Sequence, residues 1–431
     1  MNAALLVGSM LLLTFLGMPI VFSMLAASIL TILIHRPHFP DEVFAQYFVA
    51  GVQSYPLLAL GFFFLVGEWM NSGGITRRIV HFANALVGHV RGGLAQTNIA
   101  SSMMFAGISG SALADTAALG SVLIPSMKRA GYGAGFSAAV TQTSAVIGPI
   151  IPPSIPMIVF AFLAEVSVGQ MFVAGILPGV LVGAGLMVVA YAISRKRGYP
   201  VSRRASPVEV GSAFRRAMAA LLAPVIIIGG VLGGVFTATE AGTVAALYAF
   251  VVGKFWLREL SWADTWGGLV RAATGTGQVL IILGAASLFA FLIAEFRVSQ
   301  ALAAAIFSIS DSPWAFLLML NLSLLVVGLF LENLPAMVIM VPIFFPIALD
   351  LGIDPIHFGV VFVMNSLIGL CTPPIGILIY MSATLAGCKP EAVIRESLPF
   401  IAILIGAVLL VTYVPALALT LPDLLYDRTV P

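Results

Sequence analysis

The sequence predicts an all-α polytopic membrane protein built from two inverted-topology repeats. Each repeat is expected to contain a re-entrant helical hairpin and a broken transmembrane helix. Three observations predict this fold: the composition, a repeated pattern of Gly and Pro, and the distribution of basic residues. Of the 431 residues, 60% are apolar and only 9% are charged. A soluble domain has about 25% charged residues, so this composition excludes a soluble globular enzyme and a disordered chain.

Apolar runs, separated by charges and by Pro or Gly, define the elements in chain order. One span needs roughly 20 apolar residues, so the chain has room for about ten spans. The segment 3–16 is short for a full span, and this question stays open. The candidate spans are 3–16, 18–34, 52–71, 135–163, 168–194, 217–236, 240–257, 273–294, 357–386 and 398–420.

Two further apolar stretches, 93–127 and 312–349, are interrupted near their middles. The first contains the polar run 107–115, and the second contains 332–335. Unsatisfied backbone groups in lipid cost several kcal/mol each, so such tips must be buried in protein or line a wet cavity. We therefore predict two re-entrant hairpins.

Two short segments, 74–90 and 296–310, lie between a span and a hairpin. The first places Ile75, Ile79, Phe82 and Leu86 on one stripe, which is typical of an interfacial amphipathic helix. Both segments could be arms that connect a fixed part to a moving part, and both could equally be plain surface helices.

A shift of 221 residues superposes the Gly and Pro pattern without a gap. Pro125 falls on Pro346, and Gly148 falls on Gly369. The adjacent prolines 152–153 fall on 373–374 in the same way. We therefore divide the chain into a first repeat (1–194), a basic linker (195–216) and a second repeat (217–431).

The basic residues orient the two repeats. The linker 195–216 is rich in Arg and Lys, so the positive-inside rule places it in the cytoplasm. Counting spans outward, the first hairpin opens to the cytoplasm and the second to the outside. Of the 20 Lys and Arg residues, all but Arg36, Arg297 and Arg428 then lie on the cytoplasmic side. The low net charge of +2 argues against a nucleic-acid partner.

Inverted repeats with broken helices are typical of secondary transporters with a site at the membrane midplane. Adjacent prolines expose backbone carbonyls, and these oxygens, with nearby hydroxyl and amide oxygens, suit a hard cation such as Na⁺. We expect two or more bound Na⁺ ions, with one site where each hairpin tip (107–115 and 332–335) faces a helix break (148–154 and 369–375). The expected ligands of the first are Gly107, Ser109, Ser111, Gly148 and Pro149, and those of the second are Asn333, Gly369 and Thr372.

Asp115 is the most informative single residue, because a carboxylate at membrane depth is costly and usually functional. It could contact substrate, tune a sodium site or accept a proton, and it could also be the N-cap of the second hairpin helix. Glu332 is similar but closer to the outer side. The expected substrate-binding residues are Ser111, Asp115, Ser154, Asn333 and Thr372.

Neither tip and neither break contains Lys or Arg. An anionic substrate would therefore be held by helix N-termini, hydroxyl groups and bound cations. Sodium would then supply the charge that makes anion binding tolerable. A nucleophile–base pair and a metal-ligand spacing are both lacking, so we expect no enzyme activity.

Three motifs resemble one known family over essentially the whole chain. They are Gly107-Ile-Ser-Gly-Ser-Ala-Leu-Ala-Asp-Thr116, Gly148-Pro-Ile-Ile-Pro-Pro-Ser-Ile-Pro156 and Leu370-Cys-Thr-Pro-Pro-Ile-Gly376. Together they resemble the large membrane subunit (DctM-like) of TRAP (tripartite ATP-independent periplasmic) transporters, in the ion-transporter superfamily.

The resemblance implies an elevator-type transporter of the bacterial cytoplasmic (inner) membrane that imports an organic acid with the sodium gradient. The implied substrates are C4-dicarboxylates, keto acids, sialic acid and other sugar acids. The implied partners are a small TRAP membrane subunit and a periplasmic substrate-binding protein. The alternative is a self-sufficient sodium- or proton-coupled permease of the same superfamily, and a channel is a less favoured third hypothesis.

Overall fold

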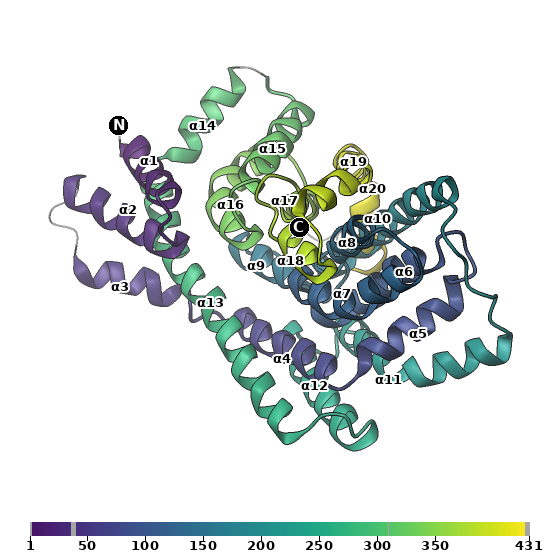
Figure 1. The fold of residues 1–431 in the computed structure, drawn as a ribbon. Helices are drawn as coiled ribbons and strands as arrows, with labels where there is room; N and C mark the ends of the chain where they lie inside the picture. The colour runs from purple at the N-terminus through teal and green to yellow at the C-terminus, as the bar shows by residue number, and fades with distance from the viewer. Residues whose placement is uncertain (1, 36–39, 309, 427–431) are drawn as a thin grey trace.

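The computed structural model describes residues 2–35, 40–308 and 310–426. This part of the chain is folded into helices joined by short turns, and it contains no strand. Two of the three basic residues placed outside, Arg36 and Arg428, lie beyond the described residues. In Figure 1 the long helix α13 runs along one side of the main body. Helices α1, α2 and α3 lie beside one end of α13, and the main body, with α6 to α10 and α15 to α19, lies on its other side.

The peripheral helices pack along α13, which contacts α2, α3, α4 and α16. A short helix, α3, precedes the predicted span 52–71 and was not expected from the sequence. The bounds are α1 (Asn2–Phe15), α2 (Ile20–His35), α3 (Asp41–Ala50), η1 (Tyr55–Leu57), α4 (Leu58–Ser72), α12 (Ala238–Val251), η2 (Val252–Trp256) and α13 (Trp262–Glu295).

The predicted hairpin 93–127 is a pair of packed helices, α6 and α7, and the predicted broken helix 135–163 is the pair α8 and α9. Helix α5 lies against both α6 and α11. The bounds are α5 (Ile75–Val87), α6 (Gly93–Ser109), α7 (Ala112–Arg129), α8 (Ala134–Ala145), α9 (Ile155–Leu163), α10 (Val168–Arg197) and α11 (Pro207–Leu232).

The second half contains two helix pairs at the predicted positions. The pair α15 and α16 covers 312–349, and α17 and α18 cover 357–386. The peptide bonds Pro152–Pro153 and Pro373–Pro374 are both cis. The bounds are α14 (Val298–Phe307), α15 (Pro313–Gly328), α16 (Asn333–Asp350), α17 (Pro355–Gly369), α18 (Ile377–Ala386), α19 (Pro390–Tyr413) and α20 (Ala416–Leu425).

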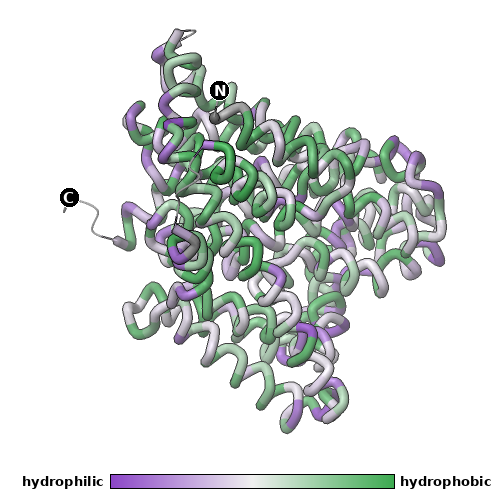
Figure 2. Tube along the Cα trace, turned by 90° about the vertical axis from the view of Figure 1, so that its left-hand side faces the viewer, coloured by the Kyte–Doolittle hydropathy of each residue, from purple (hydrophilic) through white to green (hydrophobic). Residues whose placement is uncertain are grey.

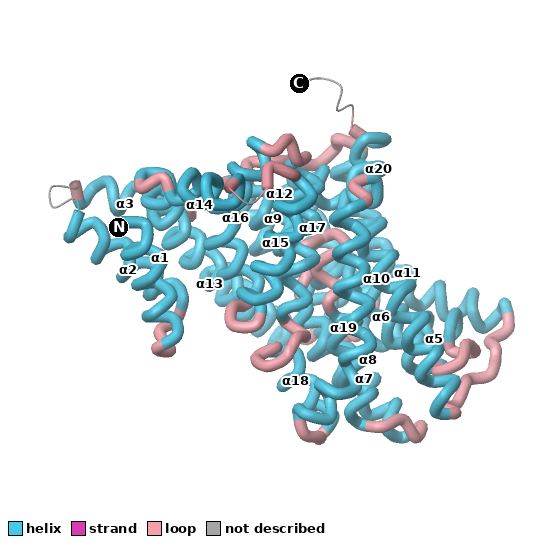
Figure 3. Tube along the Cα trace, turned by 90° about the horizontal axis from the view of Figure 1, so that it is seen from above, coloured by secondary structure: helices cyan, strands magenta, loops and turns pink. Residues whose placement is uncertain are grey.

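The outer surface and the helix lengths suit a membrane. Among the described helices, five are long and apolar enough to cross a bilayer, and one bent pair would make a sixth. Large apolar side chains on α1 and α2 are exposed, such as Phe15 at 67% and Leu33 at 66%. Figure 2 shows hydrophobic colour along most of the helical tube. In Figure 3, α3 and α14 lie along one edge, whereas α18, α7 and α5 lie toward the opposite edge.

Several helices begin earlier than the hydropathy pattern suggests, because a capped, polar first turn precedes the apolar run. Helix α11 begins at Pro207 within the predicted linker, and Ser206 with Glu209 forms a capping box there. Helix α13 begins at Trp262 rather than 273, with Ser261 as its N-cap. Since α10 continues to Arg197, only residues 198–206 of the linker are not helical.

Candidate functional site

The tip between α6 and α7 is a sharp turn at Gly110, whose φ is +59°. Ser109 ends α6, and Ser111 is the N-cap of α7, where its side chain accepts a hydrogen bond from the backbone N–H of Ala114 at 3.4 Å. A Cβ atom on Gly110 would lie 2.6 Å from the carbonyl oxygen of Pro153. The tip therefore rests directly on the break between α8 and α9.

Asp115 is completely buried in the first turn of α7. One carboxylate oxygen, Oδ1, accepts a hydrogen bond from the Ser109 hydroxyl. The other, Oδ2, lies against the α-carbon of Gly148 and has no hydrogen-bond partner among the described residues. The N-cap alternative for Asp115 is wrong, because Ser111 caps this helix.

The break after α8 places Gly148, Pro149 and Ser154 beside this tip. Ser154 is fully buried as the N-cap of α9, where its hydroxyl donates to the carbonyl of Pro149 and accepts from the N–H of Met157. The Ser154 hydroxyl therefore makes its hydrogen bonds within the break. Gly107 lies two residues before the end of α6, where a Cβ atom would meet Pro224 of α11.

The second half supplies a matching tip at the start of α16. Asn333 is 6% exposed, and its amide nitrogen has no partner among the described residues. In the break after α17, Gly369 packs closely on Gly328 of α15. The Thr372 hydroxyl donates to the carbonyl of Ile368 at 2.7 Å.

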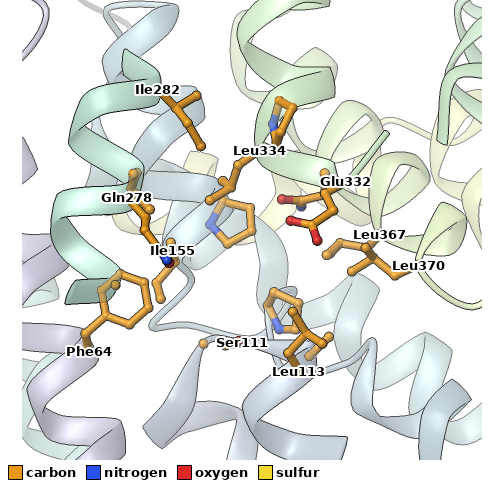
Figure 4. A pocket seen from close by; sticks show the side chains of 18 residues that line it. Phe64, Ser111, Leu113, Ile155, Gln278, Ile282, Glu332, Leu334, Leu367 and Leu370 are labelled. Atoms are coloured by element: carbon orange, nitrogen blue, oxygen red, sulfur yellow. The ribbon is translucent and has the colours of Figure 1, made fainter. Parts of the chain in front are cut away.

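A cavity of about 240 Å³ lies between the two tips and the two breaks. Ser111, Pro149 and Asn333 line it, whereas Ser154, Gly369 and Thr372 are not among its lining residues. Figure 4 shows Glu332 extending into it across from Leu113, with Phe64 and Gln278 on another wall. The lining residues are Phe64, Gly110, Ser111, Ala112, Leu113, Pro149, Ile155, Pro156, Gly275, Gln278, Val279, Ile282, Glu332, Asn333, Leu334, Pro335, Leu367 and Leu370.

Three helix N-termini converge on this cavity. The first residues of α7, α9 and α16, namely Ala112, Ile155 and Asn333, all line it. Free backbone N–H groups and the helix dipole make an N-terminus favourable for negative charge. Among the described lining residues, Glu332 is the one charged group, and Lys and Arg are absent.

A second cavity of about 350 Å³ adjoins the first and shares Phe64, Ser111 and Gln278 with it. At its far end, Arg271 of α13 donates to Glu68 of α4 at 2.7 Å. Gln278 and this ion pair were not expected from the sequence. Gln278 is a polar residue within the apolar run 273–294, which was an available signal. Nothing in the sequence pairs Arg271 with Glu68, because 203 residues separate them.

The fold is one that solved membrane transporters share. Two solved transporters share the fold, each with a TM-score of 0.61 and 14% sequence identity. They are YdaH from Alcanivorax borkumensis, aligned over 86% of both chains, and MtrF from Neisseria gonorrhoeae, over 89% of this chain and 83% of that one.

The chain belongs to the family described as "Tripartite ATP-independent periplasmic transporter, DctM component", which it matches over residues 7–417. It is 41% identical to the C4-dicarboxylate TRAP transporter large permease protein of Pseudomonas aeruginosa, over 91% of this chain and 92% of that protein. It is 39% identical to the sialic acid TRAP transporter large permease protein of Vibrio cholerae, over 96% of both. It is 36% identical to the 2,3-diketo-L-gulonate TRAP transporter large permease protein of Escherichia coli, over 93% of this chain and 94% of that protein. The chain is therefore a multi-pass TRAP large permease.

Proposed function

We propose that this large permease imports an organic acid with the sodium gradient, and that the acid binds in the cavity between the two tips. The observation that carries this proposal is the convergence of three helix N-termini on one cavity, which the amide nitrogen of Asn333, without a partner among the described residues, also lines. Helix N-termini are ready-made sites for carboxylates. The relatives' names include C4-dicarboxylate, sialic acid and 2,3-diketo-L-gulonate, which are all acids.

Charge balance is the reason for coupling this acid to a cation. The cavity contains the carboxylate of Glu332, and the Asp115 carboxylate is buried beside the first tip. The lining residues supply no basic side chain, so an anionic substrate would add to an existing negative charge. Bringing like charges together in a low dielectric is strongly unfavourable. Co-transported sodium ions would neutralise this charge.

The orphaned Oδ2 of Asp115 supports a cation position near the first tip. Buried polar atoms almost always have a partner, and a Na⁺ ion is a suitable one for an unpartnered carboxylate oxygen. Ser109, Ser111 and the break carbonyls beside Gly148 supply further oxygens nearby. For the second ion, Asn333, Gly369 and Thr372 remain the proposed ligands.

The two walls of the cavity suggest an elevator movement. One wall comes from α4 and α13, and the other comes from the hairpins and breaks. Movement of the hairpin-and-break body along α4 and α13 would carry the bound acid across the bilayer. We propose the inner membrane as the location, with a small membrane subunit and a periplasmic binding protein as partners.

Uptake into proteoliposomes tests this function. The vesicles contain the chain with its co-purified small subunit, and the outside receives a binding protein, a pool of organic acids and an inward sodium gradient. We expect one acid to accumulate, and we expect its uptake to be lost when potassium replaces sodium. Equal uptake without the binding protein would instead favour a self-sufficient permease. Uptake that follows a proton gradient and ignores sodium would overturn the sodium coupling.

A further inference from the structure

A strongly basic cleft lies outside the transport cavity, between α5, α11 and the turn η2. It consists of two adjoining hollows of about 700 and 520 Å³, which share Arg78 and Arg216. Arg77 and Arg78 come from α5, Arg215 and Arg216 come from α11, and Trp256 comes from η2. The cleft thus gathers four guanidinium groups from two elements that are far apart in the sequence.

Most of this positive charge is uncompensated. Glu259 is the one acidic residue among the described lining residues, and it pairs with Arg78 at 2.6 Å. Arg77, Arg215 and Arg216 are exposed and form no ion pair with any residue that the structure describes. Arg77 lines one hollow, Arg215 lines the other and Arg216 lines both. Three guanidinium groups without an ion pair around these two adjoining hollows favour a ligand with a negative charge.

The surroundings place this cleft at the membrane–water interface. Trp256, Trp262 and Trp266 are 63%, 69% and 68% exposed on the adjacent surface. Exposed tryptophans are enriched at the level of the lipid headgroups. The basic residues also assign this side of the protein to the cytoplasm.

An apolar surface continues from the cleft along α11 toward the membrane interior. Leu222 and Val225, two and three turns beyond Arg215, are 36% and 62% exposed. Phe214 is 46% exposed and packs against Phe82 of α5, with ring centroids 5.5 Å apart. A ligand with a phosphate at one end and acyl chains at the other would match both surfaces.

We propose that this cleft binds the headgroup of an anionic phospholipid from the cytoplasmic leaflet. Arg215 and Arg216 contact its phosphodiester from α11, and Arg77 contacts it from α5. Guanidinium groups bind phosphate oxygens in a bidentate manner, and basic pockets between helices on this side of a membrane hold anionic headgroups. Because α5 also lies against α6, the lipid ties the α6–α7 hairpin to α11 through α5.

Lipid titration followed by native mass spectrometry tests this site. The full chain is purified in detergent with any membrane subunit that accompanies it, delipidated, and titrated with phosphatidylglycerol or phosphatidylcholine. The test variant is R215Q/R216Q. The matched control is R203Q/R204Q, which removes the same charge from an exposed position nearby. We expect phosphatidylglycerol binding to weaken about 25-fold in the test variant, since each arginine near the surface contributes a factor of about five.

The control should bind phosphatidylglycerol as the wild type does. Equal weakening in both variants would overturn the proposal, because it would show a general charge effect. Equal binding of phosphatidylcholine would overturn it too, and so would displacement of the lipid by millimolar glycerol phosphate, which would indicate a site for a soluble phosphate. If R215Q/R216Q does not fold, R77Q on the opposite wall tests the same site, with an expected loss of about fivefold. This test measures no transport, so it stands apart from the proposed function.

Discussion

Asp115 is the residue whose surroundings are least consistent with a purely structural role. Its carboxylate is fully buried, yet one oxygen has no partner among the described residues. A buried carboxylate that only stabilised the tip would be expected to use both oxygens. The unpartnered atom instead lies beside Gly148, in the turn between α8 and α9.

The substitution D115N keeps the shape and the hydrogen bond from Ser109 but removes the charge. We expect sodium-dependent uptake to fall about 100-fold. Losing a hydrogen bond or ion contact to a charged group costs about 3 kcal/mol, which corresponds to a change of this size. Uptake is measured in proteoliposomes, after the amount of variant in the membrane is confirmed. D311N, on an exposed carboxylate outside the cavity, is the control and should transport normally. Near-normal uptake by D115N would remove Asp115 from the mechanism.

Among the elements, the contact between the first tip and the first break determines the shape of the site. Gly110 has a positive φ and leaves no space for a Cβ atom beside Pro153. Gly131 also has a positive φ, of +88°, but open space surrounds it. The two glycines therefore separate the effect of backbone conformation from the effect of close packing.

We expect G110A to lower thermal stability more than G131A and to abolish uptake. Both variants bear the cost of a left-handed backbone, about 1–2 kcal/mol. Only G110A also forces the tip away from the break. Unfolding temperature in detergent and uptake in proteoliposomes are measured side by side. Equal behaviour of the two variants would show that the tip does not depend on this contact.

The sequence predicted elements well where Gly and Pro interrupt apolar runs. The turn at 110–111 lies within the predicted tip 107–115, and the turn at 329–332 and the breaks at 146–154 and 370–376 overlap the predicted interruptions 332–335, 148–154 and 369–375 with shifts of one to three residues. Helix α3 and the first turns of α11 and α13 were missed, because their polar residues lower the local hydropathy. The sequence did not predict that α4 and α13 form a wall of the cavity. Contacts between segments that are distant in the sequence, such as Glu68 with Arg271, leave no periodic signal.

In the molecule as a whole, the two cavities adjoin and together extend from the tips to the Glu68–Arg271 pair. The side chain of Arg271 is 54% exposed, whereas Asn333 at the other end is 6% exposed. The second cavity is therefore reached from solvent at the Arg271 end. The positive-inside rule predicts that this end faces the cytoplasm.

A cysteine at Thr274, which lines the second cavity, tests this access. In a C388S background, we expect a membrane-impermeant thiol reagent to label T274C rapidly from the cytoplasmic side and slowly from the outside. The remaining Cys371 is buried and should not react. D311C, on the opposite face, is expected to show the reverse preference. Rapid labelling of T274C from the outside alone would contradict the orientation.

We propose that sodium and the organic acid cross the membrane together, because the cavity would tolerate the anion only when cations are bound. Entry of radioactive sodium into proteoliposomes, with and without the transported acid, tests this claim most directly. We predict that the acid, together with the partner proteins, stimulates sodium entry, and that D115N loses the stimulation. Acid uptake with no accompanying sodium entry would contradict the account.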